Sequence, residues 1–169
     1  GDMASLLQPK VAANFSDFQW LADGSGFYLA TNQGREFNAV AFYDLASGQL
    51  RTLSATDADA DNVKLAGGGD LLLWTTNEEG YSKLQGVDLV TQQPMRLPKL
   101  PAGVYDIDVS TTGEVVSVNL NGPGTPGDVY VWSIGTPEQV DRIFAASIGG
   151  LDPSTFVTPI SLNYPAPVS

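Results

Sequence analysis

A pattern that the sequence repeats three times is the feature that most constrains the fold of this chain. Each copy opens with two apolar residues at alternate positions, continues to a turn glycine and an asparagine, and closes on an aliphatic residue. The turn glycines are Gly24, Gly69 and Gly113. The asparagines, which we expect to bond to the local backbone in turns, are Asn32, Asn77 and Asn121. The interval is about 45 residues, a period typical of propellers and other repeat architectures.

Each copy of the repeat predicts four short β-strands. In the third copy the strand-like segments are 105–110, 115–121, 128–134 and 140–145, and in the second copy the fourth such segment is PMRLP, residues 94–98. The stretches between them, such as TTGE and GPGTPG, contain the residues that turns require. Helical periodicity is poor, and the 18 glycines and 11 prolines would interrupt any long helix. We therefore expect an all-β chain.

A four-stranded antiparallel sheet that recurs at this period is the blade of a β-propeller. We predict an all-β partial β-propeller of about three four-stranded antiparallel blades, in which Trp20, Trp74 and Trp132 are packing residues. Complete propellers have about 4 to 8 blades, so the end blades of this chain would expose sheet faces. Either the chain is part of a longer propeller, or it forms a homo-oligomer through those exposed end blades.

The predicted division of the chain follows the repeat. Residues 1–13 form a tail or a stray strand of a preceding blade, the three blades span 14–60, 61–102 and 103–147, and residues 148–169 form an exit segment.

The composition excludes several classes of function. The chain has 19 acidic and 8 basic residues and a formal net charge of −11, which argues against nucleic acid and against anionic membranes as partners. It has no cysteine and no histidine, so disulfides, thiolate metal sites and a Ser-His-Asp triad are excluded. We expect no cofactor. The composition leaves the compartment open between cytoplasm and periplasm.

Four segments resemble the propeller domain of the S9 serine peptidases, which are the prolyl oligopeptidase group with its dipeptidyl and acylaminoacyl peptidase relatives. They are GFYLATNQGREFNAVAFYDLASGQLRTL (26–53), TTNEEGYSKLQGVDL (75–89), TPGDVYVWSIGTPEQVDRIF (125–144) and GGLDPSTFVTPISLNYP (149–165). TolB-like propellers share part of this pattern and are the second choice. The second and fourth segments fit the peptidases better.

The resemblance implies a propeller joined to an α/β-hydrolase domain that carries the catalytic Ser, Asp and His. The exit segment, 148–169, would then lead toward that domain. This chain has no G-x-S-x-G motif and no histidine, so no catalytic residue is carried over. The function implied is a non-catalytic propeller that controls substrate access in an S9-like serine peptidase. Its partners would be the hydrolase domain of the same polypeptide or a peptide substrate. The alternative is a stand-alone TolB-like module for protein–protein interaction.

The stretch TDADADN places Asp57, Asp59 and Asp61 at alternate positions, as at the start of a calcium loop. The EF-hand pattern then requires glycine at the sixth position and glutamate at the twelfth. Asn62 and Gly68 stand there instead, so we expect a solvated loop between blades.

An acidic face is the other candidate site. In an antiparallel blade the second-to-third loop and the connection to the next blade lie on the same side of the disc. This predicts a common side for Glu36, Asp57, Asp59, Asp61, Glu78 and Glu79. Such a face would attract cationic peptide ends, and the simpler interpretation is a solvated rim. The sequence assigns no catalytic, cofactor-binding or metal-binding residue, and it leaves substrate-binding residues undetermined.

Overall fold

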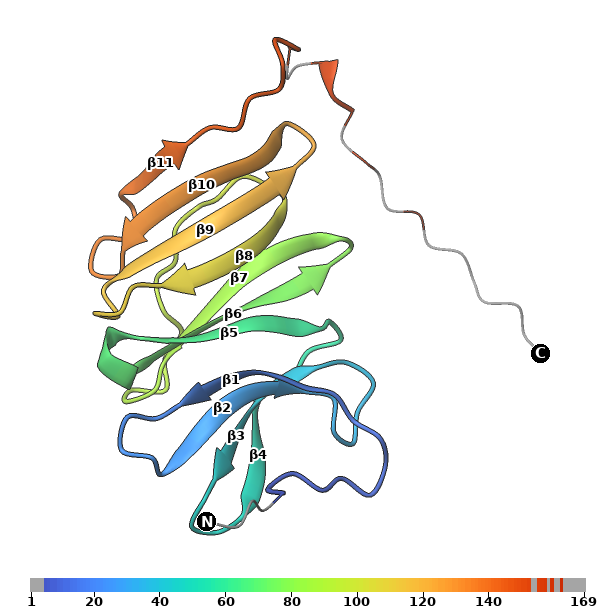
Figure 1. Cartoon of the computed structure of the whole chain (residues 1–169), viewed down its shortest axis with the longest axis vertical. Coiled ribbons are helices and arrows are strands. Elements are labelled where there is room, and N and C mark those ends of the chain that lie inside the picture. Colours follow the sequence, from blue (N-terminus) through green and yellow to red (C-terminus); the bar gives the residue numbers. More distant parts are fainter. Residues whose placement is uncertain (1–4, 153–154, 158, 160–161, 163–169) are drawn as a thin grey trace, which may run out of the picture.

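Three antiparallel sheets stand side by side along the long axis of the molecule (Figure 1). The computed structural model describes residues 5–152, 155–157, 159 and 162. The all-β prediction is confirmed, and the arrangement is that of a partial propeller. The helical element η1 (Gly67–Gly69) is a single 3-10 turn, and Thr155 is also in 3-10 conformation. The described residues include no helix with the length and apolar character that crossing a membrane requires.

The first and third blades each have four strands in sequential order. The first blade consists of β1 (Phe15–Trp20), β2 (Gly26–Thr31), β3 (Ala39–Asp44) and β4 (Gln49–Ser54). The third blade consists of β8 (Val104–Val109), β9 (Val115–Gly122), β10 (Thr125–Ser133) and β11 (Val140–Phe144). No strand forms within residues 5–14, and much of the expected exit segment, 148–169, lies outside the described residues.

The second blade has three strands, β5 (Ala60–Ala66), β6 (Leu71–Glu78) and β7 (Tyr81–Asp88). The fourth strand that we expected at residues 94–98 is reduced to one bridge, between Pro94 and Val87. Two hydrogen bonds flank this bridge, from Asp88 N–H to the Gln93 carbonyl (2.9 Å) and from Met95 N–H to the Gly86 carbonyl (3.0 Å). Pro94 lies at the non-hydrogen-bonded position between these two bonds, where its missing N–H breaks no bond to β7, and the pairing extends no further along residues 94–98.

Apolar side chains from both faces of the second blade join the three sheets. Toward the first blade, Leu72 and Trp74 pack with Tyr28 and Val40. Toward the third blade, Leu73 packs with several buried residues of that blade, including Ile107, Val116, Val118, Leu120 and Trp132. Alternation along β6 sends successive side chains to opposite faces, so one strand contributes to both interfaces.

The first strands of the blades, β1, β5 and β8, contact one another across the two interfaces. The backbone N–H of Asn62 donates to Asp17 Oδ2 (3.1 Å), and Asn62 Nδ2 donates to the Tyr105 carbonyl (3.2 Å). The backbone N–H of Leu65 donates to Gln19 Oε1 (3.3 Å). Each interface therefore combines an apolar centre with polar contacts between first strands.

Candidate functional site

The loops on one side of the molecule carry the acidic residues singled out in the sequence. The β2–β3 loop, the β4–β5 connection and the β6–β7 loop all reach the right-hand side in Figure 1. These segments, with the start of β5, carry Glu36, Asp57, Asp59, Asp61, Glu78 and Glu79. The antiparallel order of strands is the cause, because alternate connections return to the same edge of each sheet.

Two of these carboxylates are engaged in contacts within the fold. Asp59 Oδ1 accepts the backbone N–H of Asn38 at 2.8 Å, which ties the β4–β5 connection to the β2–β3 loop. Glu78 forms an ion pair with Lys83 at 3.4 Å. Glu36, Asp57 and Glu79 are exposed. Their charge is thus available to a ligand approaching this side.

Asp61 is the second residue of β5, and although the residue is exposed, the groups around its carboxyl partly desolvate it. Burial raises the pKa of Asp61, and the neighbouring carboxylates of Asp17 and Asp59 raise it further. Nevertheless, the described residues contain no group of three or more carboxylates that could hold a metal ion. Asp57, Asp59 and Asp61 are thus not gathered into such a group in this part of the chain.

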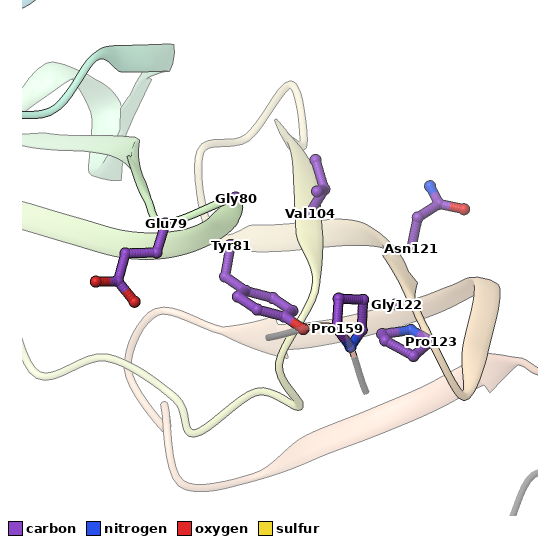
Figure 2. Close-up of a pocket in the computed structure, with 8 residues that line it drawn as sticks. All are labelled: Glu79, Gly80, Tyr81, Val104, Asn121, Gly122, Pro123 and Pro159. Carbon is purple, nitrogen blue, oxygen red and sulfur yellow. The ribbon is translucent and has the colours of Figure 1, made fainter. Parts of the chain in front are cut away.

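A pocket of about 300 Å³ opens on this same side, at the junction between the second and third blades (Figure 2). Its lining consists of Glu79, Gly80, Tyr81, Val104, Asn121, Gly122, Pro123 and Pro159. The β6–β7 turn positions one wall, since Asn77 Oδ1 accepts the N–H of Gly80 at 3.0 Å and Glu79 has a left-handed φ of 54°. Glu79 lines the pocket, and Figure 2 shows its carboxylate pointing away from the Tyr81 ring and the two prolines.

The Tyr81 side chain is the chemically distinctive group of this pocket. Its hydroxyl oxygen is buried and has no hydrogen-bond partner in the described part of the chain. Figure 2 shows the ring reaching toward Pro123 and Pro159. A buried hydroxyl without a partner is unfavourable by about 1 to 3 kcal/mol, so a ligand atom that bonds to it would recover this energy. The pocket thus suits a small apolar group that carries a hydrogen-bonding atom.

The sequence identified only one of the polar groups at this pocket as a site candidate, Glu79. Tyr81, Val104 and Pro123 were missed because the pocket forms where two blades meet, and no local motif marks such a junction. Asn121 lines the pocket. Asn77 bonds to the local backbone as expected, by accepting the N–H of Gly80, whereas Asn32 accepts the N–H of the distant Asn14 at 2.7 Å.

No protein-family model matches this sequence, and no curated protein matches it significantly. Several solved structures are similar to this chain. Over 86% of its length the chain is similar to prolyl oligopeptidase B from Galerina marginata in its apo form, with a TM-score of 0.70 and 19% identity. The same enzyme bound to a 35-residue hydrolysis and macrocyclization substrate gives a TM-score of 0.70 over 85% of the chain. TolB from Acinetobacter baumannii matches 82% of the chain, with a TM-score of 0.65 and 18% identity.

These likenesses settle the architecture. The chain is a partial β-propeller. It spans 21% of the prolyl oligopeptidase and 33% of TolB. The predicted resemblance to S9 propellers, with TolB-like propellers as second choice, is confirmed at the level of the fold. Identities of 18% and 19% carry no activity from one protein to the other.

Proposed function

We propose that this chain is the non-catalytic propeller region of an S9-like serine peptidase, where it governs which peptides reach the catalytic domain. The observation that carries the proposal is the match of 86% of the chain to part of a prolyl oligopeptidase. The acidic side and the pocket beside Tyr81 are the features that would act on a substrate.

The proposed mechanism is selective admission. The exposed carboxylates of Glu36, Asp57 and Glu79 attract a cationic peptide end, because a surface of one sign raises the local concentration of the opposite charge. The pocket then accepts a small apolar side chain, and the Tyr81 hydroxyl bonds to a neighbouring peptide group. Folded proteins are excluded because the entrance admits only extended chain.

Activity-based labelling of the protein made from its complete reading frame tests this proposal. A fluorophosphonate probe reacts with the activated serine of a serine hydrolase. Labelling that a serine-peptidase inhibitor prevents supports the proposal. A complete protein that is not labelled, and whose reading frame lacks a G-x-S-x-G segment, contradicts it.

The likeness to TolB supports a second candidate, a propeller that binds a protein partner on one face. The same experiment separates the two functions, because a propeller without a hydrolase domain is not labelled. A specific complex recovered with the unlabelled protein, and lost when Glu36, Asp57 and Glu79 are neutralised together, would favour the interaction module.

A further inference from the structure

The segment that follows the bridge at Pro94 carries backbone groups that the fold leaves unpaired. Its far end is fixed at Gly103, whose carbonyl accepts the N–H of Ser82 at 2.8 Å. Between these two points, residues 96–100 form no backbone hydrogen bond within the described part of the chain. Four N–H groups are unpaired there, those of Arg96, Leu97, Lys99 and Leu100. An unpaired stretch of this kind can form hydrogen bonds with another chain.

A groove separates this stretch from the turn between β10 and β11. It consists of two hollows, of about 350 and 360 Å³, which share Arg96, Pro137 and Glu138 in their walls. We call it the interblade groove, and its two walls are residues 93–99 and residues 134–140. Both β7 and β10 end toward the left-hand side of Figure 1, so the groove lies away from the acidic loops.

The floor of the interblade groove is apolar. Five of its side chains pack against the core between the second and third blades but are only half-buried: Leu71, Met95, Leu97, Ile134 and Val140. Each keeps apolar surface that a ligand can cover, and removing such surface from water favours binding.

Two cations stand on the wall formed by residues 93–99. Arg96 and Lys99 are exposed, and neither forms an ion pair within the described residues. They can attract carboxylates in spite of the net charge of −11, because salt screens exposed charges beyond about 8 to 10 Å. The lining also includes two carboxylates, of which Asp88 is bonded to N–H groups of its own turn. Glu138 is exposed on the opposite wall, so an acidic ligand must direct its carboxylates toward Arg96 and Lys99.

These features together fit an extended peptide of alternating character. Successive side chains of an extended chain point to opposite sides, so aliphatic residues at alternate positions can cover the floor while the residues between them reach the rim. Acidic side chains at the rim then meet Arg96 and Lys99. The peptide backbone pairs with the free groups of residues 96–100, as when a strand is added to the edge of a sheet.

We propose that the interblade groove binds an extended segment of a partner protein in which aliphatic residues alternate with acidic ones. The apolar floor and the backbone pairing supply the affinity, and the two cations supply the preference for acidic sequences. The inference does not depend on either of the functions proposed above, since those concern the opposite side of the molecule.

Titration of the isotope-labelled chain with acetyl-Glu-Leu-Glu-Leu-Glu-amide tests the proposal through chemical shifts. We expect the largest changes within residues 93–99 and 134–140. Arg96→Glu with Lys99→Glu should weaken binding roughly ten-fold, because two attractions become repulsions. Lys10→Glu with Arg51→Glu is the matched control, since it makes the same change in net charge at exposed positions outside the groove. This control should change the dissociation constant by less than about two-fold.

Two further peptides separate charge from backbone pairing. Acetyl-Lys-Leu-Lys-Leu-Lys-amide should bind to the groove residues at least roughly ten-fold more weakly. N-methylation of both leucines and N-methylation of the first two glutamates should differ in effect, because only alternate N–H groups of a strand face one neighbour. The proposal is overturned by the absence of binding or by shift changes centred on Glu79 and Tyr81. Equal weakening by the two charge-reversed variants, equal binding of the lysine peptide in the groove, or equal effects of the two methylations overturns it as well.

Discussion

Asn62 and Asp17 hold equivalent places in successive blades and are bonded to each other, the N–H of Asn62 donating to Asp17 Oδ2 at 3.1 Å. Both have a left-handed φ of 55° and both lie where the ladder of their strand shifts register. The Asn62 side chain also donates to the carbonyl of Tyr105, so one residue connects all three blades. Asn and Asp tolerate this conformation better than most other residues.

Substitution of Asn62 separates these two roles. Asn62→Ala removes the two hydrogen bonds that Asn62 Nδ2 donates, to the Tyr105 carbonyl and to Thr75 Oγ1. It also puts alanine, which tolerates a left-handed φ less well than asparagine, at this position, so we expect a loss of about 2 to 4 kcal/mol in the free energy of unfolding. Asn62→Gly tolerates the backbone conformation and should lose less. Urea unfolding measures both, and equal stability of the two variants would contradict a role for backbone conformation here.

Gly113 occupies the β8–β9 turn in close contact with the glycine turn of the second blade. Its φ is 76°, its carbonyl accepts the N–H of Gly67 at 2.8 Å, and an added Cβ would lie 2.9 Å from the nitrogen of Gly68. Gly113→Ala should therefore destabilise the chain by more than the roughly 1 kcal/mol of a left-handed alanine. Gly24→Ala is the matched control, because Gly24 has φ of 71° and open space around it. If Gly24→Ala is destabilised as much as Gly113→Ala, the close approach to Gly68 does not contribute to the loss of stability.

The repeat period predicted the blades because each blade must cover apolar faces with a neighbour of like shape. The same reasoning failed at residues 94–98, where apolar residues suggested a strand. Met95 and Leu97 do pack against the core between the second and third blades, but the backbone of this segment pairs with β7 only at the bridge between Pro94 and Val87. The hydrophobic pattern therefore indicated which side chains are buried, and it did not indicate how far the backbone pairs.

The candidate site was less predictable than the fold. The side that carries the acidic loops followed from strand order, because alternate connections share an edge. The pocket did not, since Tyr81 and Pro123 meet only after two blades pack together. The exposure of Trp20 (54%), which we expected to be a packing residue, was also invisible in the sequence, because Trp20 holds the same repeat position as Leu65 and Val109, which are half-buried.

The turn after β7 should make stability fall in acid. Asp88 Oδ1 accepts the N–H groups of Thr91 (2.7 Å) and Val90 (2.9 Å), and its backbone hydrogen bond to Thr91 is the main cause that lowers the pKa of Asp88. A lowered folded-state pKa stabilises the fold above the unfolded-state pKa, and this stabilisation is lost as pH falls through the folded value. Asp88→Ala should therefore flatten the decline of melting temperature below about pH 4. If the melting temperature of Asp88→Ala declines below pH 4 as steeply as that of the original chain, this role of Asp88 is contradicted.

Asp61 should show the opposite dependence. Burial and the nearby Asp17 and Asp59 raise its pKa, so the folded chain binds this proton more tightly than the unfolded chain does. The charged form is destabilising at neutral pH, and the penalty disappears as pH falls through the folded-state pKa. Asp61→Asn should raise the melting temperature at pH 7, with a gain that shrinks toward pH 4. Asp57→Asn, at an exposed position in the same connection, is the control and should change little. If the rise in melting temperature of Asp61→Asn is the same at pH 7 and pH 4, it arises from packing and not from the charge of Asp61.

Tyr81→Phe tests the pocket, because it removes one oxygen atom and leaves the ring. The hydroxyl is buried without a partner, so its removal should leave the melting temperature unchanged or raise it by a few degrees, in contrast to most core substitutions.

The same substitution, Tyr81→Phe, should weaken peptide binding. Titration with the tetrapeptide Leu-Pro-Ala-Gly, followed by chemical shifts of residues around the pocket, measures this effect. We expect roughly five- to ten-fold weaker binding in Tyr81→Phe, corresponding to one hydrogen bond of about 1 kcal/mol or slightly more. Acetylation of the peptide's amino end should weaken binding to the natural chain and not to Glu79→Gln. If Tyr81→Phe binds the peptide as tightly as the original chain, the Tyr81 hydroxyl takes no part in binding. If acetylation of the peptide weakens its binding to the original chain and to Glu79→Gln equally, Glu79 does not bind the amino end.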